Sequence, residues 1–372
     1  MSPVTKGCPM IPIAKPFIGE EEKRAVLDVL SSGMLVQGPK VQQLEKSFAA
    51  YCGVKHAVAV SNGTAALHAS LRALGIGQGD EVITTPFTFV ASANAILMAG
   101  ATPVFADIDE KTFNISPIEV EKKITKKTKA ILAVDLYGLP ADYIKLKETA
   151  AKHKLKLVAD ACQSIGAELN GKKTGSLADV TAFSLYATKN IMCGEGGIIT
   201  TNDDTIAEFA KKFRHHGQKE QYSYEFLGYN YRMTDIAAAI ALCQLARIHH
   251  WTEQRNKNAE MLTKLLQNTN VQLPFTPQHA KHAFHQYTIK TARRDHLHNY
   301  LHAAGIDSRI FYPQPLHLSP HFAFLKHKKG DFPVAESACA SVLSLPIHPL
   351  VTEEQLRFIA ATMREFFAKQ TI

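Results

Sequence analysis

The sequence predicts an α/β fold: a large domain with a mostly parallel sheet, followed by a smaller α+β domain. From residue 54 onward, short β-rich runs alternate with helical patterns, which is typical of βαβ units. Near residues 236–248 the pattern changes to a long alanine-rich helix, and residues 282–365 follow as a smaller α+β unit. At 372 residues the chain is long enough for two domains. We therefore divide it into an N-terminal tail, residues 1–12, a large domain, 13–250, and a small C-terminal domain, 251–372.

The predicted strands are runs of four or five residues, rich in apolar and β-branched side chains. In chain order they are Ala57–Val60, Glu81–Thr84, Thr102–Ala106, Ala130–Val134, Lys156–Ala159 and Thr181–Leu185. Helical patterns lie between them at Ala65–Leu74, Phe89–Met98 and Tyr143–His153. The alanine-rich helix continues past Trp251 into a charged stretch, and the last unit contains a proline-rich segment, 311–320. Strands that alternate with helices in this way pair mainly in parallel.

The composition, 46% hydrophobic and 20% charged residues, is that of an ordinary globular protein. No run approaches the roughly 18 uncharged apolar residues of a membrane span. The first residues lack the apolar segment of a signal peptide, so none is expected. The six cysteines, at 8, 52, 162, 193, 243 and 339, form no CxxC pair. This spacing argues against a disulfide framework or a zinc site and favours a cytoplasmic location.

The net charge of +8 is compatible with nucleic-acid binding, but the basic residues are dispersed. The densest run, Lys122–Lys129, follows Glu119 and Glu121, so a solvated helix face is favoured over a phosphate-binding patch. The excess positive charge would suit an anionic small substrate equally well.

Polar residues follow the strand ends, which is where ligands bind in parallel α/β sheets. The first group is Ser61–Leu67, directly after the strand Ala57–Val60. Gly63 allows close backbone approach, Thr64 supplies a hydroxyl, and a helix begins at once. The free N–H groups and the dipole of that helix end suit a phosphate. A plain helix cap is the alternative for the same residues.

Two charged residues stand near other strand ends. Asp160 follows Lys156–Ala159, where a carboxylate is costly without a cationic partner such as a protonated pyridine nitrogen. Lys189 lies on a tight turn after the apolar run Val180–Tyr186, in surroundings that favour the neutral amine of a Schiff-base former. Taken alone, the aspartate could cap a turn and the lysine could be a surface residue. With Ser184 placed to reach a phosphate, the three groups agree on pyridoxal phosphate (PLP).

Motifs along the whole chain resemble those of the DegT/StrS-like aminotransferases, the sugar aminotransferase branch of the fold-type I PLP enzymes. The likeness runs from about Ile13 to the C-terminus and is carried by ordered motifs of several residues each. They are Val36–Pro39, Ser61–Leu67, Pro86–Ala91, Val134–Gly138, Asp160–Gly166, Phe183–Gly197, Arg214–Gly217, Gly228–Met233 and Tyr312–His317. The resemblance implies the PLP-dependent transferase fold of type I, with a three-layer large domain and a smaller α+β C-terminal domain.

The resemblance also implies roles for matching residues. Lys189 would bind PLP as a Schiff base and act as the catalytic base, and Asp160 would pair with the pyridine nitrogen. The other implied cofactor contacts are Gln163 at the 3-oxygen of the ring, Gly63, Thr64, Ala65 and Ser184 at the phosphate, Phe89 stacked on the ring, and Asn230. The implied substrate contacts are Arg232, Tyr312 and His317. An ordinary core phenylalanine and a loop-bracing arginine are the alternatives for Phe89 and Arg232.

Asn230 matches an asparagine that reaches the phosphate across a dimer interface, which implies a homodimer with shared active sites. Some relatives have histidine in place of Lys189 and catalyse dehydration, so the lysine favours transamination here. Cys162 stands where small residues are usual, and we interpret it as a packing residue.

The expected reaction transfers an amino group, with L-glutamate as donor, to the keto group of a nucleotide-linked keto-deoxy sugar in amino-sugar and polysaccharide biosynthesis. No metal, nucleic acid or membrane is expected to take part. A cyclitol or other non-nucleotide keto acceptor, and a non-catalytic regulator on the same fold, stay as alternatives.

Two other enzyme classes fit the sequence poorly. A nicotinamide dehydrogenase is disfavoured because Gly75–Gly79 follows a helix and precedes a strand, the reverse of a dinucleotide fingerprint. A metal hydrolase built on His279, His282 and His285, or on His215 and His216, is disfavoured because no carboxylate ligand is paired with these histidines.

Overall fold

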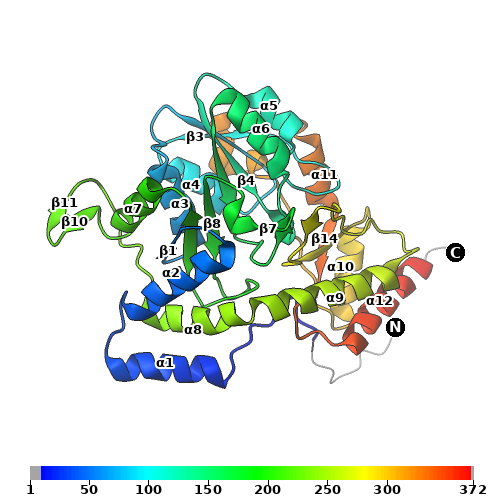
Figure 1. The fold of residues 1–372 in the computed structure, drawn as a ribbon. Coiled ribbons are helices and arrows are strands. Elements are labelled where there is room, and N and C mark those ends of the chain that lie inside the picture. Colours follow the sequence, from blue (N-terminus) through cyan, green and yellow to red (C-terminus); the bar gives the residue numbers. More distant parts are fainter. Residues whose placement is uncertain (1–9, 370–372) are drawn as a thin grey trace.

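A seven-stranded sheet forms the centre of the structure, a computed structural model that describes residues 10–369 (Figure 1). Its strands are β1 (His56–Val60), β2 (Glu81–Thr84), β3 (Thr102–Phe105), β4 (Thr128–Val134), β5 (Lys156–Asp160), β8 (Val180–Ser184) and β9 (Gly197–Thr201), in the order β1-β9-β8-β5-β4-β2-β3. Strand β9 runs antiparallel to both neighbours, and the remaining pairs are parallel. All six predicted strands are present, and the α/β fold class is confirmed.

Helices cover both faces of this sheet. On one face α3 (Gly63–Ala73), α4 (Ala91–Met98) and α7 (Asp204–Phe213) pack against residues such as Val58 and Val158. On the other face α2 (Pro39–Cys52) and α8 (Asp235–Ala246) cover Ala59, while α5 (Pro117–Lys123) and α6 (Tyr143–His153) cover Ala159. Successive strand residues therefore face opposite layers, both apolar, which explains why the strands read as continuous apolar runs.

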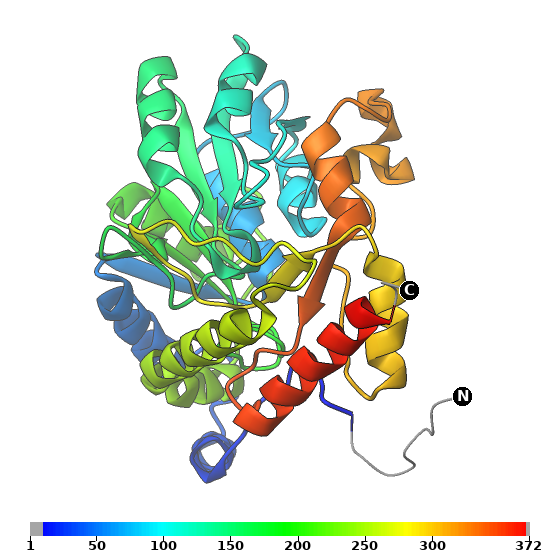
Figure 2. The same cartoon turned by 90° about the vertical axis from the view of Figure 1, so that its right-hand side faces the viewer.

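The C-terminal part has its own apolar core. The elements of this part are α9 (Ile248–Leu266), β13 (Tyr287–Lys290), α10 (Arg294–Ala303), α11 (Pro333–Ser341), β14 (Val342–Leu345) and α12 (Glu353–Ala368). Of these, α11 packs instead in a core of the large sheet, through Ala335 and Ala338. Figure 2 shows α12 lying beside α10, and α12 also packs along α9. Helix α9 joins the two parts, because Trp251 packs in a core of the large sheet and Leu262 in the C-terminal core. The domain boundary near residue 250 falls inside this helix and stays a prediction.

Most of the predicted N-terminal tail, residues 1–9, lies outside the described residues. Within residues 10–12, Ile11 is buried in the C-terminal core and pairs with Ile306. Its N–H donates to the carbonyl of Gly305 at 2.8 Å. No helix within residues 10–369 combines the length and apolar character needed to cross a bilayer.

Several elements have no counterpart in the sequence prediction. Among them are helices α1 (Glu20–Ser32), α2 and α7, strand β9, the hairpin β10 (Gln218–Glu220) and β11 (Ser223–Tyr224), and a small sheet of β6 (Glu168–Leu169), β7 (Lys172–Lys173) and β12 (Ala280–Lys281). In Figure 1 the hairpin projects away from the body of the protein beyond α7.

Candidate active site

Lys189 lies in the turn that follows β8, close to the carboxyl ends of the parallel strands. The turn is held by a bond from the Lys189 N–H to the carbonyl of Tyr186 at 2.8 Å. The side chain is partly buried, and none of the described carboxylates forms an ion pair with it. Burial lowers the pKa of Lys189, while the nearby Cys162 and Asp160 oppose this effect. Burial therefore shifts this group toward its neutral amine, which is the reactive form.

Asp160 is the last residue of β5, the strand beside β8. Its carboxylate is 5% exposed. Ser92 on α4 donates a hydrogen bond to Oδ2 at 2.7 Å, and the N–H of Cys162 donates to Oδ1 at 3.2 Å. These two bonds fix the carboxylate, yet no basic side chain among the described residues forms an ion pair with it. A buried carboxylate held in this way favours a cationic partner.

The start of α3 forms a small cradle beside β8. Asn62 caps the helix by accepting a hydrogen bond from the N–H of Ala65 at 2.8 Å. No described group accepts a hydrogen bond from the N–H of Gly63 or Thr64. Gly63 also permits close contact, because a Cβ atom there would lie 2.9 Å from the Cβ of Ser184. Two free N–H groups at a helix N-terminus beside a hydroxyl are suited to a phosphate.

Gln163, Tyr312 and Phe89 come together from three parts of the chain. The Gln163 carboxamide accepts a hydrogen bond from the N–H of Tyr137 at 2.8 Å and donates one to the hydroxyl of Tyr312 at 3.2 Å. The ring of Phe89 lies 6.3 Å from that of Tyr312 and is 56% exposed. An exposed aromatic face at this position is available for stacking on another ring.

Asn230 and Arg232 lie on the segment that follows the β10–β11 hairpin. Asn230 is exposed and forms a bridge with His215, and Arg232 approaches the ring of His215 at 2.7 Å. The carbonyl between them, that of Tyr231, accepts a hydrogen bond from the N–H of Ser61 at 2.8 Å. The segment therefore runs beside the start of the cradle. The contact with His215 fits the loop-bracing alternative for Arg232, and its substrate role stays a prediction.

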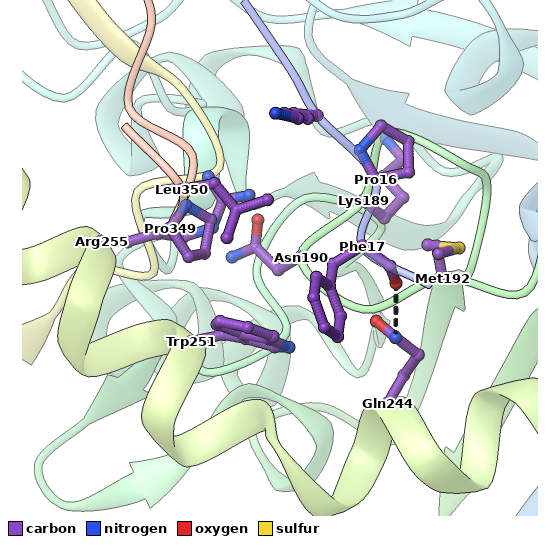
Figure 3. A pocket seen from close by; sticks show the side chains of 11 residues that line it. Pro16, Phe17, Lys189, Asn190, Met192, Gln244, Trp251, Arg255, Pro349 and Leu350 are labelled. Carbon is purple, nitrogen blue, oxygen red and sulfur yellow. Dashed lines mark hydrogen bonds between the residues drawn. The ribbon is translucent and has the colours of Figure 1, made fainter. Parts of the chain in front are cut away.

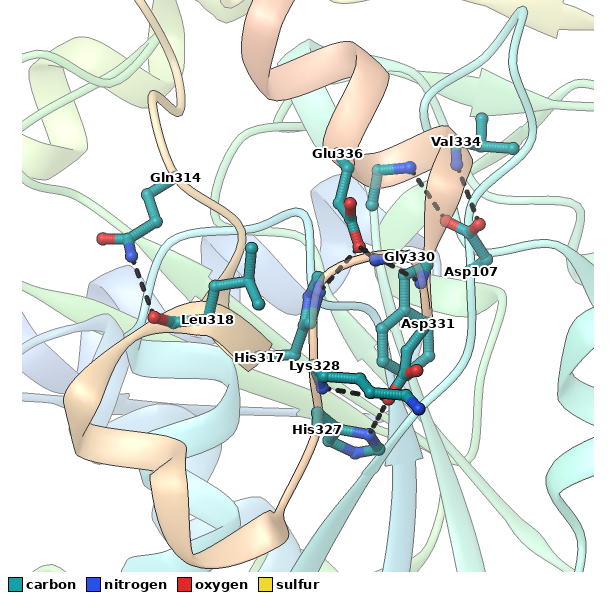
Figure 4. A network of polar contacts seen from close by, with 12 residues as sticks. Asp107, Gln314, His317, Leu318, His327, Lys328, Gly330, Asp331, Val334 and Glu336 are labelled. Atoms are coloured by element: carbon teal, nitrogen blue, oxygen red, sulfur yellow. Dashed lines mark hydrogen bonds and ion pairs between the residues drawn. The ribbon is translucent and has the colours of Figure 1, made fainter.

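The structure does not bring His317 into this group of residues. Its side chain is fully buried, and Nε2 lies 3.1 Å from Glu336, which also accepts a hydrogen bond from the N–H of Gly330 (Figure 4). Burial lowers the pKa of His317, although Glu336 opposes this shift. This burial against Glu336 gives His317 a structural contact, and its expected substrate role stays a prediction.

Several residues near this group were not expected from the sequence. Ser92 holds Asp160 from 68 positions away, and Tyr137 holds Gln163 through its N–H. Cys162 lies beside Gly63, where an added Cβ atom would approach its sulfur to 3.0 Å. Burial raises the pKa of its thiol, so Cys162 stays neutral and packs. Asn62 was visible in the sequence as a helix cap, because it stands directly before Gly63.

The residues present fit PLP. The free N–H groups of Gly63 and Thr64 match a phosphate, and the fixed and unpaired Asp160 carboxylate matches a protonated pyridine. Lys189, which is near Asp160, supplies an amine. In sequence these groups stand after β1, β5 and β8, and the sheet places them at one edge.

Comparisons with known proteins identify the family. Residues 16–364 match the model of the DegT/DnrJ/EryC1/StrS aminotransferase family. A "pleiotropic regulatory protein" of Geobacillus stearothermophilus is 43% identical over 96% of this chain and 98% of its own. The dTDP-3-amino-3,4,6-trideoxy-alpha-D-glucose transaminase of Streptomyces venezuelae is 40% identical over 96% of each chain.

A solved structure has the same fold. Spr1654 from Streptococcus pneumoniae, in its PLP form, covers 97% of this chain and 99% of its own, with 29% identity and a TM-score of 0.92. With the fold, the grouped residues and a family match over nearly all of its length, the chain belongs to the DegT/DnrJ/EryC1/StrS aminotransferase family and is a PLP-dependent aminotransferase.

Proposed function

We propose that this aminotransferase moves an amino group from L-glutamate to the keto group of a nucleotide-linked keto-deoxy sugar, for amino-sugar and polysaccharide biosynthesis. The observation that carries the proposal is the grouping of Lys189, Asp160 and the Gly63–Ser184 cradle at one edge of the sheet. The sugar class is supported by the Streptomyces venezuelae relative, whose name specifies a dTDP-linked amino sugar.

Each of the grouped residues has a separate role in the proposed reaction. Lys189 takes the Cα proton of the donor as a general base, since burial favours its neutral amine. Asp160, fixed by Ser92, would keep the pyridine nitrogen protonated. The N–H groups of Gly63 and Thr64 would hold the phosphate. When bound, PLP supplies the sink for the electrons released at Cα.

Two further residues orient the ring. Gln163 is held by Tyr137 and Tyr312, so its carboxamide would be oriented in advance to meet the 3-oxygen of the ring. Phe89 presents an exposed aromatic face from the start of α4. Tyr312 stays the proposed substrate contact, because its hydroxyl lies 3.2 Å from the Gln163 carboxamide within this group of residues. Burial raises the pKa of that hydroxyl, so it is neutral.

We also propose a homodimer in which Asn230 completes the neighbouring site. The projecting hairpin exposes apolar side chains on and beside it: Tyr222 and Leu227 are each 78% exposed. Val36, in the connection between α1 and α2, is 70% exposed. Apolar side chains that stand clear of the body in this way favour association with a second copy.

A cytoplasmic location stays part of the proposal. The five cysteines within the described residues are free thiols, which agrees with a reducing compartment.

The proposal is tested with a panel of nucleotide-linked 3-keto and 4-keto sugars, assayed for amination that depends on L-glutamate. We expect turnover with at least one member and none with Lys189→Ala. A cyclitol ketone serves as the competing acceptor. Amination of the cyclitol alone would reject the sugar proposal, and retention of DNA at physiological salt without any amination would favour a regulator.

A further inference from the structure

A small cavity lies beside Lys189, on the side formed by the N-terminal segment and helices α8 and α9 (Figure 3). The residues that matter for its chemistry are Lys15, Lys189, Asn190, Trp251 and Arg255. Its volume of about 30 Å³ leaves room for roughly two water-sized groups. That is too little for a sugar or a nucleotide, but enough for the end of a small acid.

The cavity is cationic. Lys15 and Arg255 line it from two different parts of the chain, beside the amine of Lys189, and none of the described lining residues is acidic. Lys15 belongs to an exposed stretch, so its charge stays solvated, whereas Arg255 on α9 is only 5% exposed.

Arg255 is a buried cation without an anionic partner among the described residues. Its Nη1 donates to the carbonyl of Phe284 at 3.0 Å, and its Nε is buried without an acceptor in the described part of the chain. Burial lowers the pKa of Arg255 to about 9, so the side chain is still charged at neutral pH. An uncompensated charge of this kind is costly, and an anion in the cavity would offset that cost.

The walls of the cavity are held in place before any ligand arrives. Asn190, next to Lys189, donates to the carbonyls of Ala283 at 3.0 Å and Ile165 at 3.3 Å. Gln244 donates to the carbonyl of Phe17 at 3.0 Å and so fixes the N-terminal segment, as the dashed line in Figure 3 marks. Because these amides already donate hydrogen bonds to backbone carbonyls, Lys15 and Arg255 are the groups that a ligand in the cavity would contact.

We propose that this cavity binds a carboxylate of the amino donor, with Arg255 and Lys15 as its cationic partners. The inference rests on the proposed function, since it names the group that holds the donor while its amine reacts at Lys189. A guanidinium binds a carboxylate through two parallel hydrogen bonds, which suits a site with room for two oxygens. The cavity then restricts the donor to an amino acid and excludes simple amines.

The test measures binding of 2-oxoglutarate to the cofactor-loaded protein. This keto acid has the carboxylates of L-glutamate but no amine, so binding is measured without turnover. Trp251 is the only tryptophan of the chain and lines the cavity, so its fluorescence reports occupancy. Arg255→Gln removes the charge and keeps a donor for Phe284. We expect its Kd for 2-oxoglutarate to rise about tenfold or more, the effect of losing a charge-assisted hydrogen bond.

Two further variants make the test specific. Arg294→Gln is the matched control, because Arg294 is also buried and donates to a carbonyl, that of Cys339 at 2.9 Å, but does not line the cavity. Its Kd should stay within about twofold of the wild-type value. Lys15→Met changes an exposed residue that does not endanger folding, and its Kd should rise about threefold. If Arg255→Gln does not fold, the Kd of Lys15→Met for 2-oxoglutarate decides the test.

Wild-type affinity in both Arg255→Gln and Lys15→Met would overturn the proposal, and so would equal weakening in Arg294→Gln. The acceptor is judged separately, with the sugar panel. If no sugar is aminated while Arg255→Gln still weakens 2-oxoglutarate binding, the acceptor proposal fails and the carboxylate site stands.

Discussion

Lys189 and Asp160 lie near each other, and neither side chain forms an ion pair with a described residue. The Asp160 carboxylate is held by two neutral donors, Ser92 and the N–H of Cys162, and by no cation among the described residues. Burial favours the neutral amine of Lys189. Such unpaired groups are costly in the free protein and are typical of sites that gain their partners from a ligand.

Gly63→Ala should weaken PLP binding. The added Cβ atom would lie 2.9 Å from Ser184 and 3.0 Å from the sulfur of Cys162, so the start of α3 must move away from β8. We expect the affinity for PLP to fall about tenfold or more, because the phosphate loses aligned N–H donors. Spectroscopic titration of the cofactor-free protein with PLP measures this.

Gly53→Ala is the control for that substitution. Gly53 ends α2 with a φ of 69° and has no atom within 4 Å of an added Cβ, so alanine there strains the backbone without touching the cradle. Stability should fall while the PLP affinity stays unchanged. Equal PLP affinity in Gly63→Ala and the wild type would contradict the proposal that the start of α3 binds the phosphate.

His282 should make the fold sensitive to acid. Burial lowers its pKa to about 3, against about 6.5 in an unfolded chain. Between these pH values the unfolded chain binds a proton that the folded chain does not, so the free energy of unfolding falls as pH falls. His68 and His348, with pKa values lowered to about 4 by burial, contribute with the same sign.

Urea unfolding at pH 7 and pH 5 checks this sign. His282→Asn removes one titrating group, so the loss of unfolding free energy between pH 7 and 5 should shrink by about 2 kcal/mol. The exposed His296, changed to Asn, should leave the loss unaltered. If His282→Asn lost as much unfolding free energy between pH 7 and pH 5 as the wild type, the lowered pKa of His282 would be contradicted.

Helices and strands that carry a local sequence signal could be predicted, whereas elements that depend on distant partners could not. Strands β4 and β5 could be predicted from their continuous apolar runs, which arise because both faces of these strands are covered. Helix α2 was missed because its cap comes from far along the chain. Asp235, the first residue of α8, accepts hydrogen bonds from the N–H groups of Gly38 at 2.8 Å and Val41 at 2.9 Å.

Asp235→Ala should therefore destabilise two helices at once. The carboxylate is 2% exposed and also accepts from the N–H of Lys40 at 3.1 Å, so alanine would leave three N–H groups without this acceptor. We expect a loss of about 2–3 kcal/mol of unfolding free energy, at the upper end for a helix cap. Denaturant unfolding beside Asp28→Ala, an exposed position on α1, measures it. A loss no larger than that of Asp28→Ala would contradict the role of the cap.

For the whole molecule, the sequence predicted which strand ends carry the chemistry, because each motif directly follows its strand. It could not predict the contacts made by the rest of the chain. The bond between Ser92 and Asp160, the antiparallel direction of β9 and the burial of His317 against Glu336 all depend on how distant segments pack. The cavity beside Lys189 is of the same kind, since four separate segments line it.

The central claim is that Lys189 holds PLP at this edge of the sheet. Borohydride reduction of the cofactor-loaded protein, followed by proteolysis and mass spectrometry, tests it most directly. We predict a pyridoxyl group on the peptide that contains Lys189, and none on that peptide in Lys189→Ala. A pyridoxyl group on any other lysine of the wild-type protein, with the Lys189 peptide unmodified, would contradict the account.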